Sequence, residues 1–397
     1  MTSNKITFTS VKFTNFKALR NFSLSLGRMN ILVGPNNCGK STIISAFRIL
    51  DIALRQAFTR KATSVPSING KITFGHIIPE DNIPVPLENV HTDYEETESR
   101  IEFRISNGNR IILYFPADEG CIITWETEGK TITTPGLLKK AFPINIKVIP
   151  VLGPLEHKEE LLHEDTIKRN LTTHRASRHF RNYWRYYPDD FKKFADIIAS
   201  TWPGMQIEAP TLLFPNKLSM MCFENRKPSE IYWSGFGFQV WCQLLTHISR
   251  ISRTQDTTIL VVDEPEIYLH PDVQRQLLGI LRDIEADILL ATHSTEIIAD
   301  AEASEILLVD KTKNSAERVK NIEGIQKALD QIGSIQNITL THLARTKKIL
   351  FVEDLDDYKI IRRFARKLSL SELSSGNDIT ALKSGGFSSW EKVKSLS

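Results

Sequence analysis

Gly34-Pro35-Asn36-Asn37-Cys38-Gly39-Lys40-Ser41 is the stretch of this 397-residue chain from which both fold and function can be predicted. It fits the pattern G-x-x-x-x-G-K-[ST] and lies between the apolar run Asn30–Val33 and a helix-like stretch that begins at Ser41. Glycines in such a turn let successive backbone N–H groups converge on anionic oxygens, and the N-terminus of the following helix adds partial positive charge. The sequence therefore predicts a phosphate-binding loop.

The side chains of this loop fit a nucleoside triphosphate, ATP, together with Mg²⁺. We expect Lys40 to reach the β- and γ-phosphates and the Ser41 hydroxyl to ligate Mg²⁺. Cys38 is expected to fill its place in the loop as a small residue rather than to act as a redox switch. The expected nucleotide-binding residues of the loop are Gly34, Asn36, Asn37, Cys38, Gly39, Lys40, Ser41 and Thr42.

Further along the chain, two more apolar runs end in polar residues. The run 259–262 is followed by Asp263 and Glu264, which suits Asp263 for holding the Mg²⁺ hydration shell and Glu264 for polarising the attacking water. The run 287–291 is followed by Thr292 and His293. Either motif is weak alone, but their order after a phosphate-binding loop predicts a site that hydrolyses ATP.

In this order the motifs resemble the ABC-type ATPase heads of the SMC and OLD (overcoming lysogenization defect) group. The stretch 264–271 (EPEIYLHP) is similar to that group's D-loop, and His293 matches its switch histidine, which implies contact with the γ-phosphate. Ser234 and Gly235 resemble the signature motif that closes over the nucleotide of the opposing subunit, so the resemblance implies a homodimer or a higher even homo-oligomer. The family's Q-loop glutamine is absent after 147–152, and Glu156 is the candidate there for sensing metal or water.

The C-terminal stretch 349–353 (ILFVE), with Asp357 four residues after Glu353, resembles the opening of a Toprim domain. The resemblance implies that Glu353 and Asp357 bind Mg²⁺, or Mn²⁺, and activate water for in-line attack on a phosphodiester. Asp354 stands where the family has glycine, and the Toprim DxD pair does not occur before Ser397. We therefore expect the sequence to be part of a longer protein, with a degenerate Toprim domain as the alternative.

Two basic clusters are candidates for contact with DNA phosphates, which would be salt-dependent and largely independent of sequence. The first lies in the stretch 166–185, which we expect to be helical, with Arg175, Arg178 and Arg185 on one face. An equally supported alternative is a solvated face paired with the acidic residues just upstream. The second cluster follows Glu353. The candidate arginines are Arg175, Arg178, Arg181, Arg185, Arg362, Arg363 and Arg366.

Composition limits the remaining possibilities. A chain with 41% hydrophobic and 24% charged residues is globular rather than disordered, collagen-like or only coiled coil. With Lys+Arg 50 against Asp+Glu 47, net charge alone does not predict nucleic-acid binding. The four cysteines are too widely spaced for a zinc site. Because no apolar run approaches ~18 residues, we expect a cytoplasmic protein without a membrane partner, and the family resemblance implies that it is bacterial.

We expect an α/β protein built from an ABC-type P-loop ATPase head and the start of a Toprim, Rossmann-like α/β domain. The head, 1–340, has a β-rich N-terminal part, with hairpin signals at 107–109 and 128–129, and a helical insertion at about 155–205. Residues 341–397 form the Toprim part. The segment between Leu152 and Trp233 is too short for a long coiled-coil arm, which disfavours an SMC-type repair ATPase.

The leading function is a nucleotide-regulated DNA endonuclease of the OLD family, similar to those in bacterial anti-phage systems such as Gabija or retron-linked effectors. Its partners would be DNA and a defence protein such as a reverse transcriptase with noncoding RNA or DNA, or a helicase. The alternative is an ATPase scaffold or sensor with an inactive Toprim domain that holds or activates a partner effector.

Overall fold

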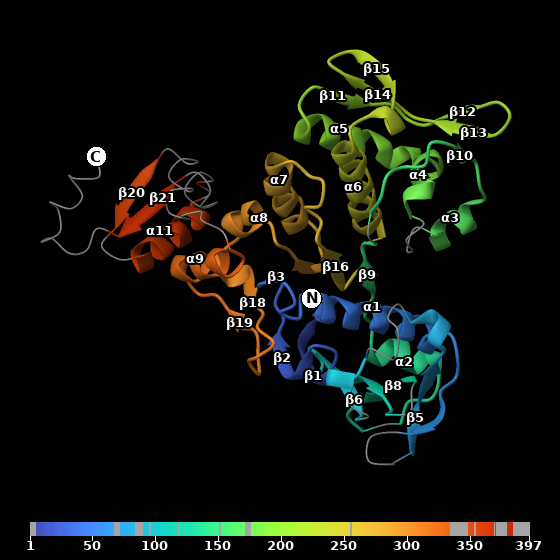
Figure 1. The fold of residues 1–397 in the computed structure, drawn as a ribbon, viewed down its shortest axis with the longest axis vertical. Helices are drawn as coiled ribbons and strands as arrows, with labels where there is room; N and C mark the ends of the chain where they lie inside the picture. The colour runs from blue at the N-terminus through green and yellow to red at the C-terminus, as the bar shows by residue number, and fades with distance from the viewer. Residues whose placement is uncertain are drawn as a thin grey trace, which may run out of the picture. The chain divides into compact units, whose positions relative to one another are not determined.

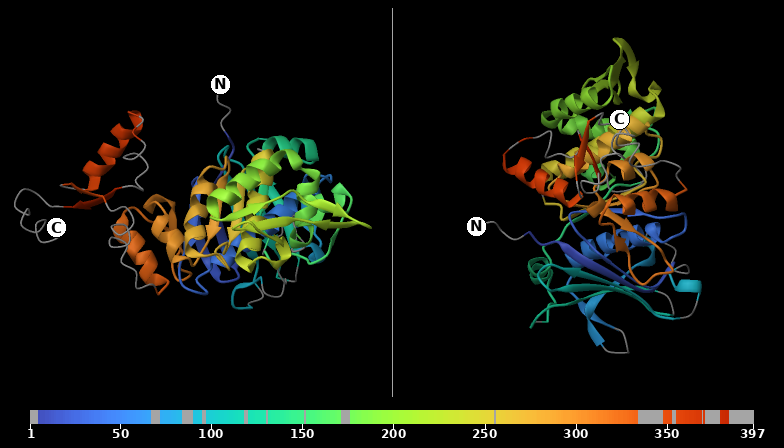
Figure 2. Two further views of the ribbon diagram at one scale, coloured as in Figure 1. Left: turned by 90° about the horizontal axis from the view of Figure 1, so that it is seen from above. Right: turned by 90° about the vertical axis from the view of Figure 1, so that its left-hand side faces the viewer.

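The computed structural model describes residues 5–66, 72–83, 90–94, 97–117, 120–129, 131–150, 152–170, 176–254, 256–333, 348–352, 355–368, 370 and 379–383. The chain divides into two compact units, Met1–Lys320 and Asn321–Ser397, each of which is described by itself (Figures 1 and 2). The boundary expected at 340 lies outside the described residues and stays a prediction.

A six-stranded sheet of the first unit carries the strands that precede the three expected nucleotide motifs. Its strand order is β19-β18-β3-β17-β16-β9, and all strands except β19 run parallel. Their bounds are β3 (Met29–Val33), β9 (Ile146–Val148), β16 (Ile259–Asp263), β17 (Asp287–Ala291), β18 (Ile306–Leu308) and β19 (Glu317–Arg318). Because the carboxyl ends of parallel strands share one edge, the segments that follow β3, β16 and β17 come together there.

A seven-stranded antiparallel sheet forms the β-rich N-terminal part, in the order β2-β1-β6-β7-β8-β5-β4. Its strands are β1 (Phe8–Phe16), β2 (Leu19–Ser25), β4 (Thr63–Pro66), β5 (Ile72–Ile78), β6 (Ser99–Ile105), β7 (Arg110–Phe115) and β8 (Cys121–Glu126). The hairpin expected around 107–109 is confirmed as β6 and β7, with Gly108 at φ 87° in its turn. The hairpin expected around 128–129 is wrong: β8 pairs with β7 and β5, which leaves no free edge for 131–134.

Helix α1 (Lys40–Ala57) follows the phosphate-binding loop and contacts both sheets. Phe47 packs against Phe8 and Phe103 of the antiparallel sheet, with ring centroids 5.6 and 5.3 Å apart. Other residues of α1 contact β9 and β16 of the parallel sheet. The helix therefore buries apolar residues toward both sheets, which explains why its apolar positions are spread over more than one face.

The chain between β9 and β16 contains several helices and two small sheets in the orders β10-β13-β12 and β11-β14-β15. The helices are α3 (Glu164–Asn170), η5 (Ala176–His179), α4 (Phe180–Tyr186), η6 (Pro188–Asp190), α5 (Phe191–Thr201), η7 (Ile231–Trp233) and α6 (Phe236–Thr254). The strands are β10 (Glu159–Glu160), β11 (Met205–Ile207), β12 (Thr211–Leu213), β13 (Lys217–Ser219), β14 (Met221–Glu224) and β15 (Lys227–Glu230). Trp184 of α4 stacks on Phe194 of α5 at 4.2 Å and donates a 2.9 Å hydrogen bond to Thr246 of α6, which joins the three helices.

The remaining described elements of the first unit are short or flank the parallel sheet. They are η2 (Glu80–Asn82), η4 (Thr92–Tyr94), α2 (Pro135–Ala141), α7 (Pro271–Arg282), α8 (Thr295–Asp300) and η8 (Ala303–Glu305). Helix α7 begins with Pro271 in its first turn, as the sequence pattern favours.

The second unit contains a strand–helix–strand arrangement. Its described elements are α9 (Ile322–Gln331), β20 (Ile349–Val352), α11 (Leu355–Lys367) and β21 (Thr380–Lys383). β20 and β21 pair in parallel, and Ala365 of α11 is buried. A parallel pair joined through a helix is the basic α/β unit. The Toprim assignment stays a prediction.

Candidate nucleotide site

The phosphate-binding loop is held by close backbone packing. A Cβ atom at Gly34 would lie 2.5 Å from the carbonyl oxygen of Val309, just after β18, and 2.7 Å from the Cys38 sulfur. Gly39 has φ +112° and is the N-cap of α1, so a side chain there would be strained. The two glycines of the motif are therefore required by the path of the backbone. Cys38 is buried as a small residue of the loop.

Lys40 turns its ammonium group back onto this loop. Its Nζ donates hydrogen bonds to the carbonyl oxygens of Gly34 (2.7 Å) and Pro35 (3.2 Å), and only 5% of the residue is exposed. Burial lowers the pKa of Lys40, while Cys38, Glu264 and Glu266 act in the opposite direction. The Lys40 ammonium also lies 3.8 Å from the Cys38 sulfur, and no described carboxylate forms an ion pair with it, so this buried cation can attract an anion. Asn36, Asn37 and Ser41 are exposed at the loop surface, and Thr42 is buried.

The acidic pair stands at the end of β16. The Oδ2 of Asp263 lies 3.1 Å from the Nη2 of Arg48 on α1, and burial raises the pKa of Asp263 against the opposing effect of that guanidinium. Glu264 adopts φ 45°, and its backbone N–H donates to the carbonyl of Ala291 at the end of β17 (2.9 Å). The left-handed conformation is costly for a non-glycine residue such as glutamate, and strained residues of this kind cluster at active sites.

His293 follows β17 and faces Glu264. The distance from His293 Nε2 to Glu264 Oε1 is 3.9 Å. Burial and the nearby Lys40 lower the pKa of His293, while Glu264 raises it. The structure therefore brings the expected Lys40, Asp263, Glu264 and His293 to one edge of the parallel sheet.

The carboxylate of Glu266 holds the histidine turn and was missed by the sequence reasoning. Its Oε1 accepts hydrogen bonds from the His293 backbone N–H (2.6 Å) and the Thr292 hydroxyl (2.8 Å). Its Oε2 is buried and has no hydrogen-bond partner among the described residues. Burial raises the pKa of Glu266. The only sequence signal was its place in the stretch 264–271, two residues after Glu264.

Ser234 and Gly235 immediately precede α6. No hydrogen bond or ion pair between described residues joins this turn to the phosphate-binding loop of the same chain. The Ser234 hydroxyl donates to the carbonyl of Ile231 at 2.6 Å. A Cβ atom at Gly237 would lie 2.4 Å from the Tyr268 carbonyl oxygen, so the start of α6 packs directly on the stretch 264–271.

The first basic cluster differs from the expectation. Arg181 is fully buried and pairs with Glu159 and Glu230, so its assignment to DNA contact is wrong. Arg178 pairs with the carboxylate of Glu156 at 3.0 Å. Arg185 is exposed on α4, and Arg175 lies outside the described residues. The stretch 166–185 is not one helix, because α4 begins anew at Phe180 and places Arg181 inward.

The residues of the C-terminal candidate site are described only in part. Glu353 lies outside the described residues, and Asp357 is exposed in the first turn of α11. Arg362 and Arg363 lie on the same helix, with Arg363 exposed, and Arg366 belongs to its last turn. Among the described residues no cluster of three or more His, Cys, Asp or Glu side chains could hold a metal ion. No described helix is long and apolar enough to cross a membrane.

Comparison with known proteins supports the fold and the family resemblance. Residues 29–299 match the family described as "AAA domain, putative AbiEii toxin, Type IV TA system". The chain is similar to "Old nuclease" of Escherichia phage P2, with 23% identity over 87% of this chain. It spans 66% of the length of that relative. The resemblance to OLD proteins that the motifs indicated is thereby confirmed.

Solved structures show a similar head. A crystal structure of the SmcHead bound to the C-winged helix domain of ScpA has a TM-score of 0.51 and 15% identity, covering 81% of this chain and 99% of that one. The SMC head domain from Thermotoga maritima has a TM-score of 0.44 and 13% identity, covering 79% of this chain and all of that one. The first of these confirms the expected fold of an ABC-type ATPase head.

Proposed function

Because the chain belongs to the family described as "AAA domain, putative AbiEii toxin, Type IV TA system", we propose that it binds ATP with Mg²⁺ and hydrolyses it between two copies of the chain. One observation carries this proposal: Glu264 and His293 face each other at 3.9 Å, and the charge of Lys40 acts on His293. Three chemically distinct groups thus stand where the loop, β16 and β17 end. Phosphoryl transfer relies on cations that bind the phosphates and on a residue that orients the attacking water, and Lys40 and Glu264 can fill these two roles here.

Each residue has a separate role in this proposal. Lys40 and the N-terminal N–H groups of α1 bind the β- and γ-phosphates, with Gly34, Gly39 and the other loop residues as their frame. Ser41 and Asp263 hold Mg²⁺, which when bound neutralises charge on the transferring phosphoryl group. Glu264 accepts a hydrogen bond from the attacking water and orients it. His293, positioned by Glu266, contacts the γ-phosphate.

Nucleotide binding by purified wild-type protein and by the Lys40→Ala variant tests this site. Calorimetry with ATP and Mg²⁺ should show binding to the wild type and none to the variant, because the cationic partner of the phosphates is removed. A Glu264→Gln variant is the matched control, since it should bind ATP without hydrolysing it. Equal ATP affinity of Lys40→Ala and wild type would contradict the proposal.

A second copy of the chain is the proposed partner at the turn Ser234–Gly235. The serine hydroxyl and the N-terminal amides of a helix can cap a γ-phosphate across an interface. Two aromatic rings at this turn are exposed: Trp233 is 70% exposed, and Tyr268, which packs on Phe236, is 62% exposed. Exposed aromatic rings beside a polar turn are typical of protein interfaces. These observations support a homodimer in which ATP lies between the two chains.

We propose further that this ATPase controls a nuclease acting on DNA. The similarity to a protein named Old nuclease supports nuclease activity in general terms. Glu353 and Asp357 are the proposed ligands of Mg²⁺ or Mn²⁺ and would activate water at a phosphodiester. Arg363 and Arg362 on α11 are proposed to contact DNA phosphates. A role in bacterial anti-phage defence, in the cytoplasm and with a reverse transcriptase or helicase partner, belongs to the same proposal.

Cleavage of plasmid by purified protein tests the nuclease. Reactions with Mg²⁺ or Mn²⁺, with and without ATP, should give cleavage that a Glu353→Ala variant lacks. Asp354, which replaces the family's glycine beside Glu353, favours the second candidate, an ATPase scaffold or sensor that holds a partner effector. ATP hydrolysis without cleavage under any of these conditions would support that second function.

A further inference from the structure

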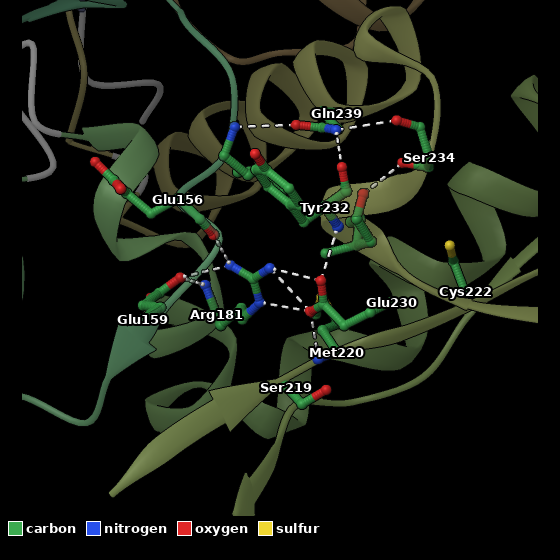
Figure 3. A network of polar contacts seen from close by, with 12 residues as sticks. Glu156, Glu159, Arg181, Ser219, Met220, Cys222, Glu230, Tyr232, Ser234 and Gln239 are labelled. Carbon is green, nitrogen blue, oxygen red and sulfur yellow. Dashed lines mark hydrogen bonds and ion pairs between the residues drawn. The ribbon is translucent and has the colours of Figure 1, made fainter.

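The turn before α6 is tied to the segment that leaves β9 by one buried glutamine. The Oε1 of Gln239 accepts a hydrogen bond from the backbone N–H of Leu155 at 3.0 Å. Its Nε2 donates to the carbonyl oxygens of Tyr232 (2.7 Å) and Ser234 (3.0 Å), as Figure 3 shows. Only a side chain with both an acceptor and two donors can make these three bonds, and the partners fix which end of the amide is which.

A buried ion cluster holds the other side of the same turn. Arg181, which is 0% exposed, donates to both carboxylate oxygens of Glu230, from Nε at 2.9 Å and from Nη2 at 3.0 Å. Its Nη1 donates to the Glu156 carbonyl (3.0 Å) and to Glu159 (3.2 Å). Glu230 in turn accepts from the backbone N–H of Tyr232 at 2.8 Å. The peptide groups on both sides of Tyr232 are therefore fixed, one through Glu230 and one through Gln239 (Figure 3).

The segment thus fastened to the turn comes from the parallel sheet. β9 pairs with β16 from Ile259 to Val261, two residues before Asp263. Gln239 therefore forms a direct side-chain connection between the turn and the chain leaving the strand next to the acidic pair. The hydrogen bonds of Gln239 reach three backbone groups on two different segments of the chain. A buried polar side chain with these partners therefore joins the two segments, which an apolar side chain of similar size could not do.

We propose that Gln239 is a positioning residue that sets the turn Ser234–Gly235 for contact with the nucleotide bound by the second copy. This inference rests on the proposed function and deepens it. Both amide donors of Gln239 are engaged by backbone carbonyls and its oxygen by the Leu155 N–H, so we assign it no direct contact with nucleotide. Its loss therefore weakens only the steps that need two chains, namely ATP-driven dimerisation and hydrolysis, and leaves ATP binding to a single chain intact.

The chain offers a matched control one helical turn further along α6. Gln243 is also buried, at 2% exposure, and its Nε2 donates to the Gly153 carbonyl at 2.7 Å. It also donates to the Gln239 carbonyl at 3.3 Å, but among the described residues it makes no hydrogen bond to 230–237. Gln243→Leu thus removes the same group from the same helix and the same neighbouring segment without touching the turn.

The decisive experiment compares Gln239→Leu and Gln243→Leu in the full chain. Circular dichroism reports folding, calorimetry reports ATPγS binding, and sedimentation in a Glu264→Gln background reports dimerisation. Both variants should fold and bind ATPγS like the parent. Gln239→Leu should weaken dimerisation and lower hydrolysis by about ten- to a hundredfold, since three backbone groups lose their partner. Raising its concentration should restore hydrolysis in part, which a merely structural defect would not allow.

A third variant separates the two ends of the glutamine. Gln239→Glu keeps the acceptor for Leu155 but loses the donors to Tyr232 and Ser234, so it should behave like Gln239→Leu. The inference is overturned if Gln239→Glu dimerises like wild type, or if the Gln239 and Gln243 variants lose hydrolysis equally. If wild-type protein binds no ATP, or hydrolyses it at a rate per chain independent of concentration, the proposed function itself fails and this inference falls with it.

Discussion

Arg48 forms an ion pair with Asp263, the carboxylate proposed to bind Mg²⁺. Its Nη2 lies 3.1 Å from Asp263 Oδ2, and both side chains are largely shielded from solvent. In the proposed site, Mg²⁺ would therefore compete with this guanidinium for Asp263. We expect Arg48→Gln to lower the Mg²⁺ concentration for half-maximal ATP binding, by roughly threefold for a partly buried pair. Calorimetric titrations at several Mg²⁺ concentrations measure this, with Arg28→Gln as a control arginine that makes no ion pair with Asp263. An unchanged or higher Mg²⁺ requirement would show that Arg48 does not compete.

Glu266 combines a positioning role with a buried charge. Replacing it by glutamine keeps an acceptor for the His293 N–H and removes the carboxylate. Burial raises the pKa of Glu266 above its ordinary 4.5, so its contribution to stability is present below pH 4.5 and is lost as the pH rises through the raised pKa. Glu266→Gln should therefore gain stability relative to wild type as the pH increases toward neutrality. Melting temperatures across pH 4 to 8 test this, and parallel curves for the two proteins would contradict it.

Glu266→Ala has a different expected outcome because no acceptor remains. The His293 N–H and the Thr292 hydroxyl would lose their bonds to the carboxylate, and the turn that carries His293 would shift. We expect ATP binding to be retained and hydrolysis to fall by about tenfold or more, the effect of losing a well-placed group in the transition state. Glu266→Gln is the control for charge. Equal rates of hydrolysis by the Ala variant and wild type would show that Glu266 has no role in the ATPase site.

At the scale of elements, the sequence predicted those strands, turns and helices that a local residue pattern determines. The strand–loop–helix unit of β3 and α1 could be predicted from the apolar run, the two glycines and Lys40. All of these determinants lie within a few residues of one another in the sequence. The β6–β7 hairpin follows equally from Gly108. The stretch 131–134 was predicted to pair with β8, and its own sequence carries no sign that β5 already occupies that edge. Strand neighbours in a sheet depend on distant segments, which local patterns do not encode.

Helix α6 contains a histidine that makes the stability of the fold decrease at acidic pH. His247 is buried, and burial together with Arg250 lowers its pKa from 6.5 to about 3. Folding thus favours the neutral form of the His247 side chain. The contribution of His247 to the free energy of unfolding is therefore present above pH 6.5 and is lost as the pH falls toward about 3. We expect His247→Leu to unfold at lower pH than wild type. Fluorescence-monitored acid titrations measure the midpoint, with solvent-exposed His157→Leu as control. A midpoint unchanged by His247→Leu would contradict this.

At the scale of the whole molecule, the parallel sheet explains why part of the site could be predicted. Gly34, Glu264 and His293 are far apart in sequence, yet each follows a parallel strand, so one edge collects them. The positions of Gln239 and Arg181 could not be predicted in this way, because neither residue follows a strand of the parallel sheet. Their partners lie in or beside the short elements β10, β15 and η7, whose mutual placement depends on how the helices and small sheets pack. Arg181 therefore looked like a surface cation in the sequence and is fully buried in the fold.

The exposed aromatic residue beside the turn provides a test of dimer formation. Trp233 is 70% exposed in the single chain, so its removal should cost little stability. If a second copy covers it, Trp233→Ser should weaken ATP-driven dimerisation by about ten- to a hundredfold, the usual effect of removing a central aromatic from an interface. ATP binding to the single chain should be unchanged, and hydrolysis should recover as protein concentration rises. Sedimentation velocity in a Glu264→Gln background, with and without ATP, measures this directly.

A matched control is available in Phe214, which is 97% exposed in the β12–β13 hairpin. Phe214→Ser removes a ring that is even more exposed but belongs to a hairpin that does not carry Ser234, so dimerisation should be unaffected. Because both substitutions remove one exposed aromatic ring, any general effect on solubility should appear in both. A dimer that tolerates Trp233→Ser as well as it tolerates Phe214→Ser would show that the turn is not covered by the second chain. In that case the capping role proposed for Ser234 and Gly235 would lose its geometric basis.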